Sequence, residues 1–559
     1  MASNCQRERR LEDFVSSLDS LTELVQLMIQ NGLTLHSMDQ SNLNAPRATS
    51  LPAAAKRQLA ATGVMLAIFL FAIDATIVST AMPTIVAKLG GLELYSWVFS
   101  IYMLTSALTT PLFGKLSDLY SQRRLMLIGI GIFVLGSMLC GGAQSMEALI
   151  LFRAIQGLGG GAIYALSFIV VGILYRPEER AKIQGIISGI WGIASILGPV
   201  AGGIIVEHWS WRWAFFVNLP VTAVAVVLIV VGLKEPGQER RAHRLDFAGT
   251  FTLLAALILL FYALSRSSHA AQLLNVAVLG MIALGIFFLM VFYIIERRAA
   301  EPIVPLDLFK SSLFTTSAAV GTLASMGVFG AISYLPLYLQ GVTGLTASRA
   351  GMVLLFLSVA WTAGSLIAGQ ALNRVGYRAS ATAGMILLAL AYSLFVAFKS
   401  DLSVVWVAVS GTLIGTGMGM VNLTTLVAVQ NSVSHHRIGV ATSTLMLFRT
   451  FGGAFAVSLM GTVLLHQMQR GLNQLSRGSL SAALLDKLTH PQNLLEPATR
   501  AQIPSSLLPR LIAILADAVW YAFLSGFALM LLGVAASFFM SKDTPVKMAR
   551  RVKVLTDEC

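Results

Sequence analysis

Apolar runs of about 20 residues recur along the whole chain, and they restrict its fold more than any other feature. Each run is long enough to cross a hydrocarbon core about 30 Å thick. Because lipid offers the backbone no hydrogen-bond partner, each run is predicted to be a helix. The sequence therefore predicts an all-α integral membrane protein. Fourteen spans are predicted: 61–83, 95–114, 125–143, 147–173, 183–206, 211–233, 247–264, 273–295, 313–340, 350–370, 381–398, 403–430, 440–465 and 517–541.

The charge content agrees with a membrane protein. Charged residues make up 12% of the chain, whereas soluble domains carry about 25%. The formal net charge is +13, which in a soluble protein could indicate a nucleic-acid partner. Here the basic residues lie in short loops between apolar runs, so no nucleic acid is expected and the lipid bilayer is the expected environment.

The distribution of Lys and Arg predicts the orientation. One side of the predicted membrane holds 23 of them and the short loops of the other side hold 5. The positive-inside rule then places both termini in the cytoplasm, which agrees with an even number of spans. We expect a multi-pass protein of the cell membrane, in a bacterium the inner membrane.

A weak internal repeat predicts two related halves. A loop pattern that begins at Gly114 returns at Gly369 with the same spacing, 255 residues later. The triplet Gly157, Gly159 and Gly161 returns from Gly415, 258 residues later. Two six-helix bundles of this kind are typical of rocking carriers with a site at the midplane. The predicted parts are a cytoplasmic tail (1–56), which includes a possible amphipathic helix from Leu11 to Leu33, an N-terminal bundle (57–233), a linker with two extra helices (234–312), a C-terminal bundle (313–541) with an external loop (466–516), and a cytoplasmic tail (542–559).

Three ionisable residues lie well inside predicted spans. Asp74 is about 13 residues, or roughly 20 Å, from the cytoplasmic end of the first span. A charge at that depth costs about 2.5–3.5 kcal/mol, so it needs a purpose or a partner. A carboxyl there can load and release a proton, or it can bond to neighbouring hydroxyls such as that of Thr76. Arg153 and Arg449 can hold a carboxylate ionised or gate its protonation, or tie helix carbonyls together.

The loop after the second span contains Gly114 and Asp118, followed by Arg123 and Arg124. An acid at the end of one helix and bases at the start of the next can form a charge latch on the cytoplasmic face. The alternative is a solvated turn with positive-inside charge. The repeated spacing at Gly369 favours the latch.

The fifth span contains Gly198, Pro199, Gly202 and Gly203. Small residues let another helix approach closely, and proline bends the helix by removing a backbone donor. This segment is therefore a candidate for a helix that slides on another, or for ordinary tight packing.

Polar and aromatic side chains inside the spans can line an apolar cavity, although each can equally be an interface anchor or a core residue. No phosphate-binding loop, zinc-protease motif or serine-hydrolase motif occurs. The three cysteines show no disulfide or metal-ligand spacing. We expect no enzyme activity, no cofactor and no metal. The candidate cavity residues are Tyr102, Gln156, Trp191, Tyr334, Tyr338 and Asn422.

These segments together resemble the major facilitator superfamily. The resemblance rests on the loop at 114–118, on 151–157, on 198–203, and on 74–78 with 81–83, together with 211–220 and 335–340. It covers about residues 60–545 and is closest to the fourteen-helix drug:proton antiporters of the EmrB/QacA type. Ser121 and Gln122 depart from the usual loop pattern, as does Ala194 from the pattern of the fifth span.

The resemblance implies a proton-coupled antiporter that exports amphipathic drugs or other lipophilic compounds by alternating access. Protons and a small lipophilic or cationic substrate are the expected partners, and the sequence does not identify a periplasmic adaptor. Asp74 would bind proton and substrate in competition, with Arg153 tuning it. Two alternatives stay open: a proton-linked carrier of one physiological solute, and a membrane receptor or scaffold that transports nothing.

Overall fold

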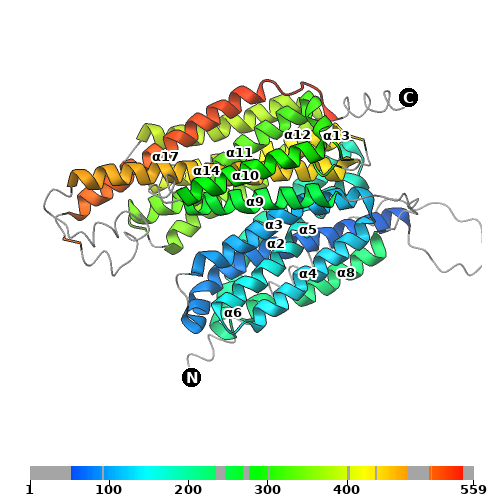
Figure 1. Cartoon of the computed structure of the whole chain (residues 1–559), viewed down its shortest axis with the longest axis horizontal. Helices are drawn as coiled ribbons and strands as arrows, with labels where there is room; N and C mark the ends of the chain where they lie inside the picture. The colour runs from blue at the N-terminus through cyan, green and yellow to red at the C-terminus, as the bar shows by residue number, and fades with distance from the viewer. Residues whose placement is uncertain are drawn as a thin grey trace, which may run out of the picture. The chain divides into compact units, whose positions relative to one another are not determined.

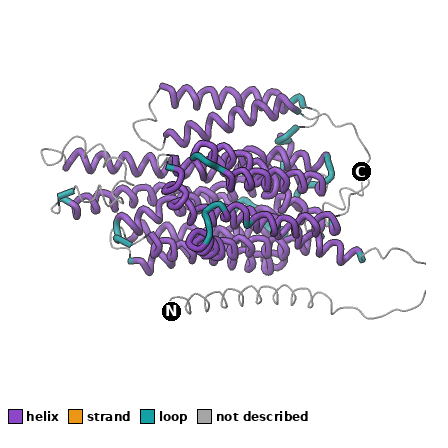
Figure 2. Tube along the Cα trace, turned by 90° about the horizontal axis from the view of Figure 1, so that it is seen from below, coloured by secondary structure: helices purple, strands orange, loops and turns teal. Residues whose placement is uncertain are grey.

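The computed structural model describes residues 52–90, 94–233, 246–267, 276–299, 302–345, 347–398, 403–434, 437–475, 503–504 and 507–545. The predicted amphipathic stretch of the N-terminal tail lies outside these residues, as does the C-terminal tail beyond 545. The described part of the chain is helical throughout, with no strand among its residues (Figure 2). The prediction of an all-α protein is therefore confirmed.

The helices divide by sequence into an N-terminal set, an inserted pair and a C-terminal set (Figure 1). The N-terminal set comprises α2 (Ala53–Leu89), α3 (Tyr95–Leu119), α4 (Gln122–Gly142), α5 (Met146–Leu174), α6 (Pro177–His208), α7 (Trp213–Phe216) and α8 (Asn218–Gly232). The inserted pair is α9 (Phe247–Ser267) and α10 (Val276–Glu296), which pack against each other. The C-terminal set comprises η3 (Leu306–Lys310), α11 (Ser312–Gly341), α12 (Ala347–Phe398), α13 (Val404–Asn431), α14 (Ile438–Leu475) and α17 (Leu508–Ser537).

Ten helices of the described residues are long and apolar enough to cross a membrane, judged by length and composition. Local sequence explains several helix starts. The Ser121 side chain accepts a hydrogen bond from the Arg124 N–H at the start of α4, and Ser145 accepts one from Ala148 at 3.2 Å at the start of α5. Serine suits these positions because its side chain satisfies an N–H that the helix itself leaves unpaired.

Helix α12 contains two of the predicted spans. Its backbone is interrupted at Gly376, whose φ of +83° is easily adopted only by glycine. The N–H groups of Tyr377 and Arg378 donate to the carbonyls of Asp543 and Ser541, each at 3.1 Å. The segment after α17 therefore replaces the hydrogen bonds that the break in α12 removes.

The predicted external loop 466–516 is helical at both of its ends. Helix α14 continues to Leu475, and α17 begins at Leu508. Packing explains the extension, because Gly471 of α14 lies against Ile514 of α17 and Met468 is fully buried. The two helices therefore stabilise each other by contacts beyond their apolar segments. Composition alone does not predict these contacts.

The repeated glycine triplets occupy matching positions in the two sets. A Cβ on Gly161 of α5 would lie 2.2 Å from the Ser106 carbonyl oxygen of α3, and one on Gly419 of α13 would lie 2.1 Å from the Trp361 carbonyl oxygen of α12. A Cβ on the middle glycine of the first triplet would lie 2.3 Å from a backbone atom of α4. In the second triplet the corresponding distance is 2.5 Å, to a backbone atom in the second part of α12. The sequence repeat therefore corresponds to a repeated three-helix contact.

We expect Gly161→Ala to lower the melting temperature of the purified protein in detergent. Overpacking of this kind costs about 1–3 kcal/mol, because the new methyl group meets the Ser106 backbone as well as the Thr109 hydroxyl. Gly131→Ala in α4 is the matched control, since nothing lies within 4 Å of a Cβ at that position. Alanine favours a helix over glycine by about 1 kcal/mol, so this variant should melt no lower than the wild type. Equal melting temperatures for the two variants would contradict the packing argument.

Candidate functional site

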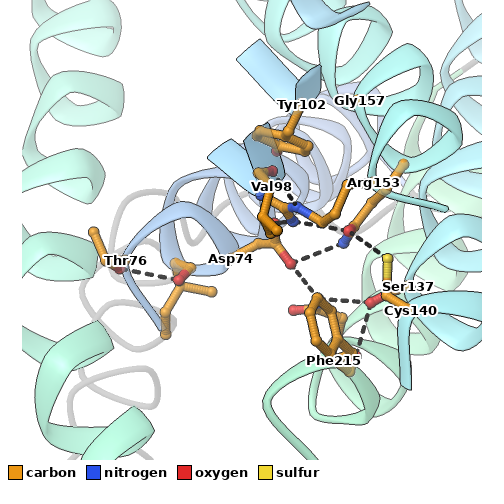
Figure 3. A network of polar contacts seen from close by, with 12 residues as sticks. Asp74, Thr76, Val98, Tyr102, Ser137, Cys140, Arg153, Gly157 and Phe215 are labelled. Atoms are coloured by element: carbon orange, nitrogen blue, oxygen red, sulfur yellow. Dashed lines mark hydrogen bonds and ion pairs between the residues drawn. The ribbon is translucent and has the colours of Figure 1, made fainter. Parts of the chain in front are cut away.

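A buried ion pair joins α2 to α5 (Figure 3). The Asp74 Oδ2 atom lies 2.6 Å from Nη1 of Arg153, and the two side chains are 0% and 1% exposed. Each residue stands out in the sequence as a charge inside a predicted span. The structure shows that they are partners.

The second oxygen of Asp74 accepts from two amide side chains. Gln156 Nε2 donates to Oδ1 at 2.8 Å, and Asn218 Nδ2 donates to the same atom at 3.1 Å. Asn218 also donates to the Ser137 hydroxyl at 3.0 Å, and that hydroxyl donates to the Phe215 carbonyl oxygen at 2.8 Å. One carboxylate therefore connects α2, α5, α8 and, through Ser137, α4.

The Thr76 hydroxyl, the predicted alternative partner of Asp74, bonds to backbone carbonyls. The Thr76 hydroxyl lies 2.9 Å from the Ile73 carbonyl oxygen and 3.2 Å from that of Ala194. Asn218 and Ser137 were not predicted as site residues. Their signal in the sequence is weak, because a single amide or hydroxyl in an apolar run usually bonds within its own helix.

Arg153 is held from three further directions. Its Nη1 donates to Gln156 Oε1 at 2.8 Å and its Nε to the Val98 carbonyl oxygen at 3.4 Å. Its guanidinium lies 4.0 Å from the centre of the Tyr102 ring, a cation–π contact. The Tyr102 hydroxyl is buried without a hydrogen-bond partner. These contacts fix the guanidinium opposite Asp74.

An aromatic cluster extends from this pair. Phe71 stands at its centre, with ring centroids 5.8 Å from Tyr102, 5.5 Å from Tyr164 and 5.7 Å from Trp191. Tyr164 also meets Phe168 edge-on at 5.5 Å. The rings of Tyr164 and Trp191 are only half-buried. The cluster therefore offers a partly open aromatic surface beside the ion pair.

The other predicted cavity residues belong to the C-terminal set. The Tyr334 hydroxyl donates to the Val457 carbonyl oxygen at 2.6 Å. Tyr338 is 2% exposed and packs edge-on against Phe395. The carbonyl oxygen of Asn422 accepts from Arg449 at 2.8 Å. Of the six predicted cavity residues, Tyr102, Gln156 and Trp191 thus lie at or beside the ion pair.

The predicted latch loop contacts the other half of the chain. The Asp118 carboxylate accepts from the backbone N–H groups of Gly439 and Val440, at 2.8 and 2.7 Å, at the start of α14. A Cβ on Gly114 would lie 2.0 Å from the Ser443 hydroxyl oxygen. A carboxylate at a helix N-terminus is stabilised by unpaired N–H groups and by the helix dipole.

Two further features complete this loop. Asp118 lies beyond the predicted span 95–114, and its burial, which outweighs the two N–H bonds, raises the pKa of its carboxyl to about 7. Arg124 is exposed and Arg123 is half-buried at the start of α4. The loop therefore presents basic side chains next to an acid that is bound to another helix.

The predicted antiporter segment packs α6 against α2. A Cβ on Gly198 would lie 1.9 Å from the Thr76 hydroxyl oxygen, and one on Gly202 would lie 2.0 Å from that of Thr80. Gly203 has nothing within 4 Å, and the side chain of Pro199 lies outside the described residues. Two of the three glycines therefore allow close helix contact.

The fold and these motifs can be compared with known proteins. Residues 64–457 match the profile of the Major Facilitator Superfamily. The multidrug transporter protein MdtP of Bacillus subtilis (strain 168) is 36% identical over 515 residues, covering 89% of this chain and 94% of that protein. Multidrug resistance protein 3 of the same organism is 33% identical over 489 residues, covering 86% of this chain and 94% of that protein.

A solved structure shows the same fold. The crystal structure of the human organic anion transporter MFSD10 (TETRAN) aligns with a TM-score of 0.59 and 17% sequence identity, covering 86% of this chain and 99% of that chain. The similarity therefore extends along most of the chain in both sequence and fold. This chain is a membrane transporter that belongs to the Major Facilitator Superfamily.

Proposed function

We propose that the chain is a proton-coupled antiporter that exports amphipathic drugs or other lipophilic compounds. The observation that carries the proposal is the buried Asp74–Arg153 pair with its amide partners. Among the described residues, the other carboxylates with substantial burial, Glu296 and Asp118, lie at the ends of α10 and α3. Asp74 is therefore the group best placed to carry a proton across the middle of the membrane.

Protonation of Asp74 supplies the coupling step. A proton on the carboxyl removes its negative charge, while Arg153 stays charged because arginine does not lose its proton in proteins. The ion pair that ties α2 to α5 is then lost, and the amides of Gln156 and Asn218 face a neutral acid. Loss of this ion pair at the centre of the N-terminal set shifts the equilibrium towards a second conformation of the helices. Alternating access requires two such conformations.

The contacts between the two sets support one closed end. Arg180 Nη1 donates to Asn431 Oδ1 at 2.7 Å, and Gln184 Nε2 donates to Gln430 Oε1 at 2.6 Å. Asp118 adds its bonds to the start of α14. All of these lie next to basic loops, which the positive-inside rule assigns to the cytoplasm. We infer an outward-facing state in which Gly114, Asp118, Arg123 and Arg124 belong to a closed cytoplasmic gate.

Fourteen spans with both termini in the cytoplasm fit these helices. The ten helices of sufficient length and apolarity become fourteen when α3, α6 and α9 are added and α12 is divided at Gly376. The two six-helix bundles are then the N-terminal and C-terminal sets, with α9 and α10 inserted between them.

The relatives favour drug export over a carrier for one physiological solute, since two are named for multidrug transport or resistance. Membership of a transporter family disfavours the receptor alternative. The half-buried aromatic cluster suits varied apolar substrates, because aromatic faces bind by area rather than by matched hydrogen bonds.

The test uses the purified protein in liposomes with an imposed pH gradient and several chemically unrelated fluorescent lipophilic compounds. We expect transport of several compounds against the proton flow, and its loss when nigericin removes the gradient. Transport that ignores nigericin would overturn proton coupling. Transport of one compound alone would favour the single-solute carrier.

A further inference from the structure

The buried charges around the candidate site do not balance. Six charged side chains are buried in the described chain. Lys115, Arg180 and Glu296 lie near helix ends, whereas Asp74, Arg153 and Arg449 lie well inside helices. Asp74 and Arg153 neutralise each other. Arg449 is 6% exposed, and no carboxylate forms an ion pair with it among the described residues. The middle of the protein therefore carries one uncompensated positive charge.

The contacts of Arg449 are neutral and incomplete. Its Nη2 donates to the Asn422 carbonyl oxygen at 2.8 Å and to the Thr425 hydroxyl. Its Nε is buried and has no hydrogen-bond partner among the described residues. Gly321 of α11 packs against it, since a Cβ there would lie 3.0 Å from Nε. A buried guanidinium with an unused donor is unfavourable unless something else completes its shell.

Arg449 of α14 bonds to α13 and lies against Gly321 of α11. It follows Leu445 by four residues, so both side chains share one face of the helix. Leu445 packs in an apolar cluster that also contains Phe71, with Tyr164 and Trp191 against it. Tyr164 lies within electrostatic range of the Arg449 guanidinium. The uncompensated charge therefore lies near Tyr164, one residue of the aromatic cluster.

We propose that Arg449 is the anion-binding residue of the substrate site, and that the substrates are aromatic, amphipathic compounds with one carboxylate or sulfonate. The ring system of such a compound would lie on Tyr164 and Trp191, and its anionic group would complete the shell of Arg449. Guanidinium groups bind carboxylates with paired, charge-assisted hydrogen bonds. This inference rests on the proposed export function and names its substrate class.

Asp74 is poorly placed to bind a cation in competition with this site. Its two oxygens already accept from Arg153, Gln156 and Asn218. A cationic substrate would therefore meet an occupied carboxylate and an uncompensated guanidinium. The expected preference is for anions, whereas the family resemblance implies a lipophilic or cationic substrate.

The experiment compares three probes with one ring system: 1-pyrenebutyrate, 1-pyrenebutanol and 4-(1-pyrene)butyltrimethylammonium. Binding to the purified protein in maltoside micelles is followed by energy transfer from tryptophan to pyrene. We expect the wild type to bind the carboxylate about 10-fold more tightly than the alcohol, and the ammonium compound least. Arg449→Gln should remove this difference, while Arg449→Lys should keep part of it.

Arg437→Gln is the matched control. It removes an exposed guanidinium immediately before α14 and leaves Arg449 and its contacts intact, so the preference for the carboxylate should persist. Comparing ratios between variants cancels the partition of each probe into the micelle. A wild type without the preference would overturn the inference, as would an Arg449→Gln variant that loses affinity for all three probes equally. The wild-type ratio decides the question even if Arg449→Gln does not fold.

Two further measurements distinguish a small organic acid from a lipid, and substrate binding from transport. An anionic lipid carries the same charge, so phosphatidylglycerol is titrated against bound pyrenebutyrate. Equal displacement at equal concentration would overturn the assignment to a small organic acid.

Binding does not require a pH gradient. A protein that binds the carboxylate through Arg449 without proton-driven export refutes the proposed function alone. Proton-driven export without any preference for anions refutes this inference alone.

Discussion

Asp74→Asn is expected to abolish proton-driven export while the protein still folds and inserts. A proton-motive force of about 150 mV supplies about 3.5 kcal/mol per proton, which supports a substrate gradient of about 300-fold. Asparagine has nearly the same size as aspartate and cannot carry the proton. The variant should therefore equilibrate its substrate, with a gradient close to one.

The measurement is the steady-state ratio of a fluorescent substrate across liposomes with an imposed gradient. Asp307→Asn is the matched control, because Asp307 forms an ion pair of similar length with Arg437, 2.7 Å, but is 46% exposed. This control should keep its gradient. A normal gradient with a normal pH dependence in Asp74→Asn would make Asp74 a packing residue and move the search for the coupling group to other acids.

Arg153→Gln is expected to destabilise the protein by about 3–5 kcal/mol, because it leaves the Asp74 carboxylate buried without its counter-charge. The double variant Asp74→Asn/Arg153→Gln should be more stable than the sum of the single changes predicts. Removing both charges leaves neutral amides in place of an unpaired ion, and amides can bond to each other.

Equilibrium unfolding in mixed micelles measures this double-mutant cycle. Arg437→Gln serves as the control, since its partner is exposed and surface pairs contribute about 0–1 kcal/mol. Additive effects of the two buried substitutions, within about 0.5 kcal/mol, would mean that the pair is not energetically coupled.

Several site residues could be identified from the sequence because a charge inside an apolar run stands out. Asp74 and Arg153 are conspicuous in this way, and Gln156 lies one helical turn from Arg153 on the same face. The sequence could not decide between Arg153 and Arg449 as the partner of Asp74, since both are arginines inside spans. Only the packing of α5 beside α2 places Arg153 at 2.6 Å.

Other contacts depend on helices far apart in the chain. Asn218 follows Asp74 by 144 residues, and its amide reaches Asp74 only because α8 packs against α2. Asp118 was predicted as part of a local latch, yet its carboxylate bonds to N–H groups more than 300 residues later. Hydrogen bonds of this kind need a direction and a distance, which residue types do not specify.

The sequence by itself determined the fold class, the repeated glycine triplets and the residues whose burial needs a physical reason. These properties follow from composition and spacing. A helix in lipid pairs its own backbone groups, and a charged side chain within it raises the free energy of insertion. The tertiary structure decided which charges pair, which glycines meet a neighbouring backbone and which guanidinium remains without a counter-ion. Pairing depends on the rotation of each helix about its axis and on which helices lie beside it. Both are determined by the packing of many side chains together.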